Sequence, residues 1–382
     1  MTSKKRILFV NDEMEMGGVA RVLNTLMANL PEDKYKIDCL VLHKTGLLLN
    51  EIPANVKVIS GTKFFETVDQ PLIELIKNMD VPLIFSKLRL LLFMKTGLIK
   101  ERIKKEREEL DQNPYDIEVA AKEGFCTIFT AFGKSKKKIN WVLTDYSVCN
   151  YSKRHMKLVK ESLEYIDLNI ADSKQAIEAY KKVFKIDNGI SIHNLMDVDR
   201  VKRDMQENKI DISEGINIVS VARFHFQKSI DRLINAHKYV LDKGIHHNLY
   251  LVGGGELENK LRKQVADLNL TTVHFLGYMK NPYGLINQCD LFVLSSLYEG
   301  FATVINESLI AQTPVLSTLV SGVDEQIIDS NYGYIVDNNQ EALNEGLYNA
   351  LKDYDKLKYM KEYLKDYHYP NEKILEEFIE VF

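Results

Sequence analysis

Short apolar runs alternate with amphipathic segments along the whole chain. The first half contains runs of β type at residues 6–11, 36–43, 56–60, 117–121, 140–145, 168–173 and 190–194. The second half contains further runs at 216–222, 248–254, 273–277, 291–296, 314–318 and 332–336. The runs are nearly continuously apolar rather than alternating, which predicts strands that helices cover on both faces of a sheet.

The segments between these runs have helical periodicity, as in "VARVLNTLMANL" at 19–30. Strand followed by helix, repeated many times, is typical of parallel, doubly wound α/β sheets. A polar stretch at 197–215 separates the two series of runs and is the predicted linker. We therefore expect two Rossmann-like domains, at 1–196 and 197–365, followed by a helix at 366–382. Ligands of such sheets bind beyond the carboxyl ends of the strands, so the cleft between the domains is the expected site.

Composition narrows the class of protein. The 382 residues suit two domains, and 45% apolar with 27% charged residues describes an ordinary globular protein. A net charge of −4 argues against a nucleic-acid binder. Four scattered cysteines without a C-x-x-C pair suit reduced thiols in a cytoplasm. The longest apolar stretch is interrupted by Lys87 and Arg89 and is too short to span a membrane.

Two carboxylates, Glu299 and Glu307, stand in "EGFATVINE" with seven residues between them. They could be surface acids, an acid/base pair, or two contacts to one elongated ligand. A fully helical segment would separate them by about 12 Å along its axis, whereas paired glycosidase carboxylates stand about 5–9.5 Å apart. The spacing therefore favours two ends of one ligand. A nucleotide sugar fits, with its diphosphate meeting the N–H groups of Phe301 and Ala302 at a helix start.

Two cations and two glycines also follow predicted strands. Arg223 comes directly after the first strand of the second half and Lys228 five residues later, a pattern that suits a diphosphate. The alternative is that both are solvated surface cations. Gly17 and Gly18 open the first helix, where free N–H groups attract an anion, although a flexible loop would read the same way. The glycines of "VGGGELENKLR" do not complete a dinucleotide fingerprint and suit a tight turn between strand and helix.

These motifs together resemble the retaining glycosyltransferases of family GT4, which have the GT-B fold. "EGFATVINESLIAQTPVLST" resembles the E-x7-E signature of that family, and "MGGVARVL", "SIHNLMDVD", "VARFHFQKSIDRLI" and "LVGGGELENKLR" resemble its other motifs. The resemblance covers most of the chain. It implies sugar transfer with retention from a nucleotide sugar, with a UDP-linked donor expected, without a metal or other cofactor. It also implies that the final helix crosses back to the N-terminal domain.

The resemblance assigns roles to individual residues. Glu299 would contact the donor sugar as a catalytic residue, while Arg223 and Lys228 would neutralise the diphosphate leaving group. Glu307 would bind the ribose, and Tyr278 would line the base pocket. The remaining predicted donor-binding residues are Gly17, Gly18, Gly300, Phe301, Ala302 and Thr303.

The acceptor side departs from a related pattern. "KINWVLTDYSV" resembles a W-V-H-T-D motif of polysaccharide-assembly enzymes, but Leu143 stands where His is expected. Either acceptor recognition differs or Asp145 takes over the polar role. The expected acceptor is a polysaccharide, such as a capsule, or a lipid-linked glycan.

The stretch 85–107 combines Leu, Ile and Phe with eight basic residues. A helix with an apolar face and a cationic flank can lie on an anionic membrane. The alternative is a solvated helix whose lysine stems cover apolar surface. We expect a cytoplasmic protein with a peripheral contact to the inner face of the membrane.

Two other functions are compatible with the sequence. Some sugar-nucleotide 2-epimerases share the two-domain architecture, but they need cleft acids and bases and act on the donor alone. A glycosyltransferase-like subunit that only binds acceptor would be expected to lose some of Arg223, Lys228, Glu299 and Glu307.

Overall fold

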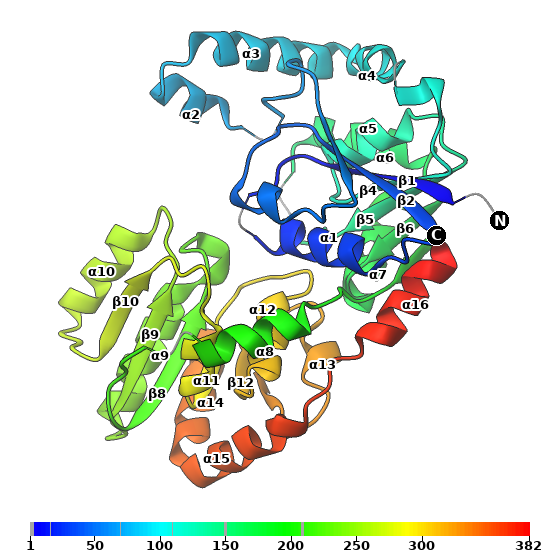
Figure 1. Cartoon of the computed structure of the whole chain (residues 1–382). Coiled ribbons are helices and arrows are strands. Elements are labelled where there is room, and N and C mark those ends of the chain that lie inside the picture. Colours follow the sequence, from blue (N-terminus) through cyan, green and yellow to red (C-terminus); the bar gives the residue numbers. More distant parts are fainter. Residues whose placement is uncertain (1–3, 16, 69, 109, 149–150, 208–209) are drawn as a thin grey trace. The chain divides into compact units, whose positions relative to one another are not determined.

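The computed structural model describes residues 4–382 except 16, 69, 109, 149–150 and 208–209, and it divides into two compact units. The first unit comprises Met1–Leu195 together with Asn371–Phe382, and the second comprises Met196–Pro370. Each unit is built on its own parallel sheet (Figure 1).

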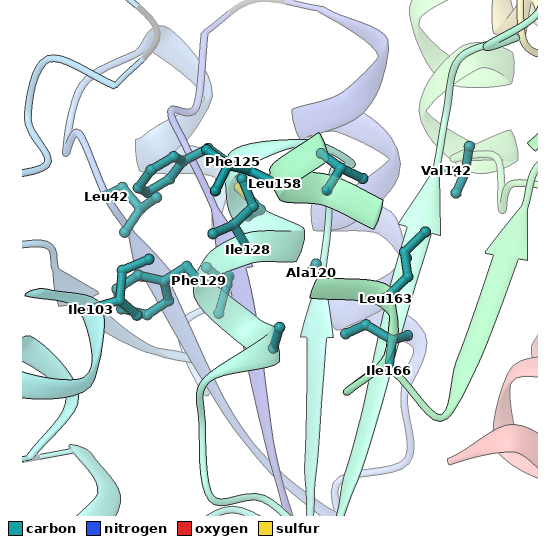
Figure 2. Close-up of a cluster of buried hydrophobic side chains, with 14 of the residues drawn as sticks. Leu42, Ile103, Ala120, Phe125, Ile128, Phe129, Val142, Leu158, Leu163 and Ile166 are labelled. Atoms are coloured by element: carbon teal, nitrogen blue, oxygen red, sulfur yellow. The ribbon is translucent and has the colours of Figure 1, made fainter. Parts of the chain in front are cut away.

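The sheet of the first unit has seven strands in the order β3-β2-β1-β4-β5-β6-β7. Its strands are β1 (Lys5–Asn11), β2 (Tyr35–Val41), β3 (Lys57–Ser60), β4 (Ile117–Ala120), β5 (Lys137–Val142), β6 (Leu168–Ala171) and β7 (Gly189–Ser191). Its helices are α1 (Gly18–Asn29), α2 (Leu72–Lys77), α3 (Val81–Thr96), α4 (Ile99–Arg107), α5 (Phe125–Ala131), α6 (Lys153–Leu163), α7 (Lys174–Phe184) and α16 (Asn371–Val381). Figure 2 shows part of the apolar cluster between sheet and helices, where Phe125, Ile128 and Phe129 of α5 lie among Leu42, Ile103 and Leu158.

The sheet of the second unit has six strands in the order β10-β9-β8-β11-β12-β13. Its strands are β8 (Ile216–Val221), β9 (His247–Val252), β10 (Val273–Gly277), β11 (Leu291–Leu294), β12 (Val315–Thr318) and β13 (Gly333–Val336). Its helices are α8 (Val198–Glu207), α9 (Ile230–Asp242), α10 (Glu258–Asp267), α11 (Tyr283–Gln288), α12 (Thr303–Ile310), α13 (Val323–Gln326), α14 (Gln340–Lys352) and α15 (Tyr354–Tyr363).

The predicted fold class is confirmed, because every predicted apolar run contains a strand and all strand pairs are parallel. In each sheet the chain builds outward in one direction from its first strand and then returns to build the other side. The order therefore reverses between β1 and β4 in the first unit, and between β8 and β11 in the second. Doubly wound sheets bind ligands at such switch points, outside the carboxyl ends of the strands.

Two expectations about local structure were wrong. The stretch 197–215 is not a plain linker, because it contains α8, and Val201 and Met205 of that helix lie in the apolar core of the second unit. The stretch 85–107 is not one helix, because Gly97 ends α3 in the left-handed conformation with a φ of 82°. Within the described residues, no helix is long and apolar enough to cross a membrane.

The cationic side of that stretch also differs from the prediction. The ammonium group of Lys87 is buried and donates hydrogen bonds to the carbonyl oxygens of Thr67 (2.7 Å) and Val68 (3.0 Å). Lys87 therefore holds a loop of its own unit instead of facing solvent. The guanidinium groups of Arg89 and Arg102 both lie over the ring of Phe64.

The C-terminal helix α16 packs on the first sheet through aromatic side chains (Figure 1). Phe378 lies against the buried Trp141 of β5, with 5.4 Å between ring centroids. Phe382 lies against Phe9 of β1, and its carbonyl oxygen accepts a hydrogen bond from the ammonium group of Lys5 at 2.9 Å.

The second unit contains two buried histidines that are joined by a hydrogen bond. Nδ1 of His247 lies 3.0 Å from the carbonyl oxygen of Ile245, which can only accept, so this nitrogen carries the proton. Nε2 of neutral His247 must then accept from Nδ1 of His237 at 2.8 Å. Nε2 of His237 in turn accepts from the hydroxyl of Thr272 at 2.8 Å. Burial lowers the pKa of both histidines, so both imidazoles are neutral near pH 7.

This arrangement predicts that acid destabilises the second unit. Burial, with the neighbouring His247 and His274, lowers the pKa of His237 from 6.5 to about 3. The unfolded chain binds more protons between these values, so stability falls as the pH drops below 6.5. We expect His237 to contribute a loss of about 2 kcal/mol between about pH 7 and pH 5, measured by urea unfolding.

The matched control is His237→Gln, which can still form hydrogen bonds but does not titrate. Its loss of stability over the same pH range should be smaller than that of the unmodified protein. Identical pH dependence in the two proteins would contradict the assignment to His237.

Candidate active site

The loop after β8 is fixed at the carboxyl edge of the second sheet. Between β8 and α9 the chain forms the 3-10 turn Phe226–Lys228, and Ser229 follows with a positive φ of 45°. The hydroxyl of Ser295, which follows β11, donates to the carbonyl oxygens of Lys228 (2.9 Å) and Ser229 (3.1 Å). The loops after the two strands at the switch point are thus bound to each other.

Lys228 and Glu299 form an ion pair at this switch point. Nζ of Lys228 lies 2.5 Å from Oε1 of Glu299, and the Ser296 hydroxyl donates to the same oxygen at 2.5 Å. The amide of Gln227 donates to the other carboxylate oxygen at 3.3 Å. Glu299 is 7% exposed, so its charge is held by protein donors rather than by bulk water.

Side chains that the motifs did not indicate support this pair. The amide of Asn338, after β13, donates to the carbonyl oxygens of Ser296 (3.3 Å) and Leu297 (2.9 Å). Arg232 in α9 donates to the Asn338 side-chain oxygen at 2.8 Å. Gln227 was detectable in principle because it stands beside Lys228, but Asn338 has no local signal since it reaches the site only through the strand order.

Arg223 lies elsewhere in the same loop. Its side chain is 74% exposed, and its Nη2 is 3.8 Å from Oε2 of Glu256. Nε2 of His225 is 3.5 Å from the other oxygen of Glu256. The structure therefore brings Lys228 to Glu299, while Arg223 pairs with the acid that follows the glycine turn after β9.

The glycine turn after β9 is shaped by backbone contact. A Cβ atom on Gly253 would lie 1.9 Å from the carbonyl oxygen of Ala222, and one on Gly255 would lie 2.6 Å from that of Phe224. The carbonyl oxygen of Gly254 accepts from the Phe224 N–H at 2.8 Å. The glycines let this turn pack on the Arg223 loop. This close packing alone explains why glycine is required at these positions, without a bound ligand.

The segment from Glu299 to Glu307 is only partly helical. α12 starts at Thr303, and Gly300, Phe301 and Ala302 form the link before it. Phe301 and Ala302 are buried, and the amide of Gln326 donates to the Ala302 carbonyl oxygen at 2.9 Å. Glu299 therefore belongs to the loop after β11.

Glu307 and Tyr278 come from different elements of the second unit. Glu307 is half-buried in α12, and its Oε1 accepts from the Tyr283 hydroxyl of α11 at 3.1 Å. Tyr278 follows β10 and is 57% exposed. Tyr278 thus directly follows a strand of the second sheet, and Glu307 lies in the helix between two other strands of that sheet.

Residues 202–367 match the family model described as "Glycosyl transferases group 1". The domain that carries the Lys228–Glu299 pair belongs to this family. The matched residues include β8 to β13 and every predicted site residue of the second unit.

The curated relatives match part of the chain. An uncharacterized glycosyltransferase of Methanocaldococcus jannaschii is 31% identical over 196 residues, which is 48% of each chain. The N-acetylgalactosamine-N,N'-diacetylbacillosaminyl-diphospho-undecaprenol 4-alpha-N-acetylgalactosaminyltransferase of Campylobacter jejuni is 31% identical over 154 residues, 35% of this chain and 42% of its own. The chain thus spans about half the length, or less, of the curated relatives it matches.

Solved structures match the whole chain in fold. The Anabaena protein HepE, crystallised with UDP and glucose, superposes with a TM-score of 0.73 over 98% of both chains at 17% identity. At this identity the likeness shows the fold alone, which is GT-B.

In the first unit, the predicted donor-binding glycines stand at the start of α1. Gly17 caps the helix with extended backbone at a φ of −179°, and no atom lies within 4 Å of a Cβ built there. Within this unit, a larger residue at position 17 would fit, because the backbone is extended and no neighbouring atom would clash with its Cβ. Gly17 and Gly18 belong to the first unit, whereas Lys228 and Glu299 belong to the second.

Asp145, the acceptor-side candidate, is buried after β5. One oxygen of its carboxylate accepts from the backbone N–H of Ser147 at 2.8 Å and from its hydroxyl at 2.6 Å. The neighbouring Leu143, which stands in place of the expected His, donates its N–H to Oε2 of Glu123 at 2.9 Å.

The switch point of the first unit carries polar residues that the sequence motifs did not indicate. Lys122, after β4, forms an ion pair with Asp12, after β1. Burial and the charge of Asp12 raise the pKa of Glu13. These residues could have been found from the sequence by inspecting every polar residue that directly follows a predicted strand. Among the described residues of the chain, no group of three or more His, Cys, Asp or Glu side chains could hold a metal ion.

Proposed function

We propose that the protein is a retaining glycosyltransferase that moves a hexose from a UDP-linked donor to a glycan acceptor. The observation that carries the proposal is the Lys228–Glu299 pair at the β8/β11 switch point, in a domain of the group 1 family. A buried carboxylate beside a cation supplies both groups that a sugar diphosphate needs. The glucose and UDP in the related Anabaena structure support this choice of donor.

In the proposed reaction, the bond between the anomeric carbon and the diphosphate oxygen breaks and UDP leaves. Lys228 neutralises the charge that develops on that oxygen, where a preformed cation is most effective. Arg223 is exposed enough to turn from Glu256 toward the phosphates. Glu299 accepts hydrogen bonds from sugar hydroxyls, and Glu307 does so from the ribose. The acceptor oxygen attacks from the face that UDP leaves, so configuration is retained, and its proton passes to the departing diphosphate.

The proposed acceptor is a polysaccharide or a lipid-linked glycan. The name of the Campylobacter relative describes transfer to a sugar on diphospho-undecaprenol, which supports a lipid-linked substrate. Asp145 and the Asp12–Lys122 pair, at the carboxyl ends of neighbouring strands, are the proposed acceptor-side groups. Such a substrate places the protein on the cytoplasmic face of the membrane, which it would contact through residues 85–107.

A panel of nucleotide sugars tests the proposal. We expect one or more UDP-sugars to raise the unfolding temperature and to be hydrolysed slowly without acceptor, because a ligand that binds the folded state stabilises it. Both effects should persist in excess EDTA, since Lys228 and Arg223 supply the positive charge.

The Lys228→Ala variant serves as the control and should lose hydrolysis. Epimerised donor in place of hydrolysed donor would favour a 2-epimerase. If the protein binds acceptor glycans but neither hydrolyses nor transfers the sugar of any donor, an acceptor-binding subunit would be favoured. A strict metal requirement would contradict the proposed source of positive charge.

A further inference from the structure

The first unit contains a basic pocket of about 530 Å³, and neither Asp12 nor Lys122 of the switch point in this unit lines it. It lies between the end of α3, the first turn of α4 and the first turns of α6. We refer to it as the α3–α6 pocket, and its charged lining residues are Lys95, Lys100, Lys153, Arg154, Lys157 and Glu161.

The charge of the pocket is not balanced by its own residues. Glu161 is the single acid that lines it, and its carboxylate pairs with Lys100 at 2.6 Å and Lys157 at 3.9 Å. Within the described part of the chain, Lys95, Lys153 and Arg154 have no ion pair. Five cations facing one acid, in a concave site, leave a net positive charge that a bound anion would offset.

The start of α6 is also locally unfavourable without such an anion. Lys153, Arg154 and Lys157 occupy its first two turns, where the helix N-terminus already carries about half a positive charge. α6 has no acidic residue in its first turn. Natural sequences break a local rule of this kind mainly at functional sites, where a ligand compensates.

An exposed apolar stripe runs along α3 toward this pocket. Val81, Phe85, Leu88 and Leu92 are 70%, 70%, 49% and 55% exposed. Their spacing of four, three and four residues puts them on one helix face, and three residues further along stands Lys95, which lines the pocket. Ile73 and Ile76 of α2, which packs on α3, are exposed as well.

We propose that the α3–α6 pocket binds the phosphate group of an anionic phospholipid while the stripe enters the bilayer interface. The apolar stripe and the basic pocket meet at Lys95. A phospholipid has the same arrangement, because its phosphate group lies next to its hydrocarbon chains. This deepens the proposed peripheral contact by naming its ligand and adding α6 to it. It does not depend on the sugar-transfer reaction.

Flotation with vesicles tests the proposal on the full chain. The protein should bind vesicles of phosphatidylglycerol and phosphatidylcholine, and bind phosphatidylcholine alone at least about tenfold more weakly. Lys153→Glu/Lys157→Glu should lower binding to the anionic vesicles at least about tenfold. Phe85→Ser/Leu88→Ser should lower it too, since it removes the apolar contact.

The matched control is Lys160→Glu/Lys182→Glu, which changes the net charge equally on α6 and α7 outside the pocket. It should bind nearly as well as the unmodified protein. Equal losses in both charge variants would overturn the pocket assignment. Saturable binding of soluble glycerol phosphate as tight as vesicle binding would overturn the lipid assignment in favour of a free phosphate. Donor-induced thermal stabilisation reports on the sugar-nucleotide site separately, so failure of one proposal is distinguishable from failure of the other.

Discussion

Lys228→Ala should lower kcat for sugar transfer by about 10²–10³-fold, the loss expected when one preorganised group at a developing charge is removed. The effect should fall on kcat more than on KM, because the charge on the leaving diphosphate is greatest in the transition state. Lys228→Arg keeps the charge and should recover part of the rate. Steady-state kinetics with the UDP-sugar found in the panel provide the measurement.

The control is Lys238→Ala, which removes a partly exposed lysine of α9 that pairs with Asp242 on its own helix. It should leave kcat unchanged. Glu299→Ala should be as impaired as Lys228→Ala, because each residue holds the other in place at 2.5 Å. Full activity of either variant would contradict the proposed mechanism.

The sequence predicted the strands well because each is a short apolar run. β11 is an example, since Leu291, Phe292, Val293 and Leu294 are all at most 1% exposed, as expected for a strand covered on both faces. The pattern also placed Lys228 and Glu299 after strands. It did not show that β8 and β11 are neighbours, and only this neighbourhood brings together two side chains that are 71 positions apart.

Features that depend on tertiary partners escaped the sequence. α8 was taken as a linker because charged residues dominate it, although Val198, Val201 and Met205 follow a helical spacing. Lys87 was counted as a solvent-facing cation because the carbonyl oxygens that bind it come from Thr67 and Val68 in another element. Asn338 was missed for the same reason, since it donates to the carbonyl oxygens of Leu297 after β11 and Leu319 after β12.

A buried charge cluster in the first unit should give the largest effect on stability. Arg107 of α4 is fully buried, and its Nη2 lies 2.6 Å from Oε1 of Glu118 and 3.1 Å from Oδ1 of Asp111. Desolvation by burial raises the pKa of Glu118. A Cβ atom on Gly133 would lie 2.2 Å from Nη2, so the guanidinium fills the available space.

Arg107→Leu should lower the free energy of unfolding by about 3–5 kcal/mol, because it leaves two buried carboxyl groups without their cation. Lys104→Leu on the same helix removes a pair whose side chains are 55% and 71% exposed, and should cost less than about 1 kcal/mol. Urea unfolding of both variants gives the comparison. If the unpaired carboxyl groups cause the loss, Arg107→Leu/Asp111→Asn/Glu118→Leu should recover much of it. Similar costs for Arg107→Leu and Lys104→Leu would show that the cluster does not stabilise the fold.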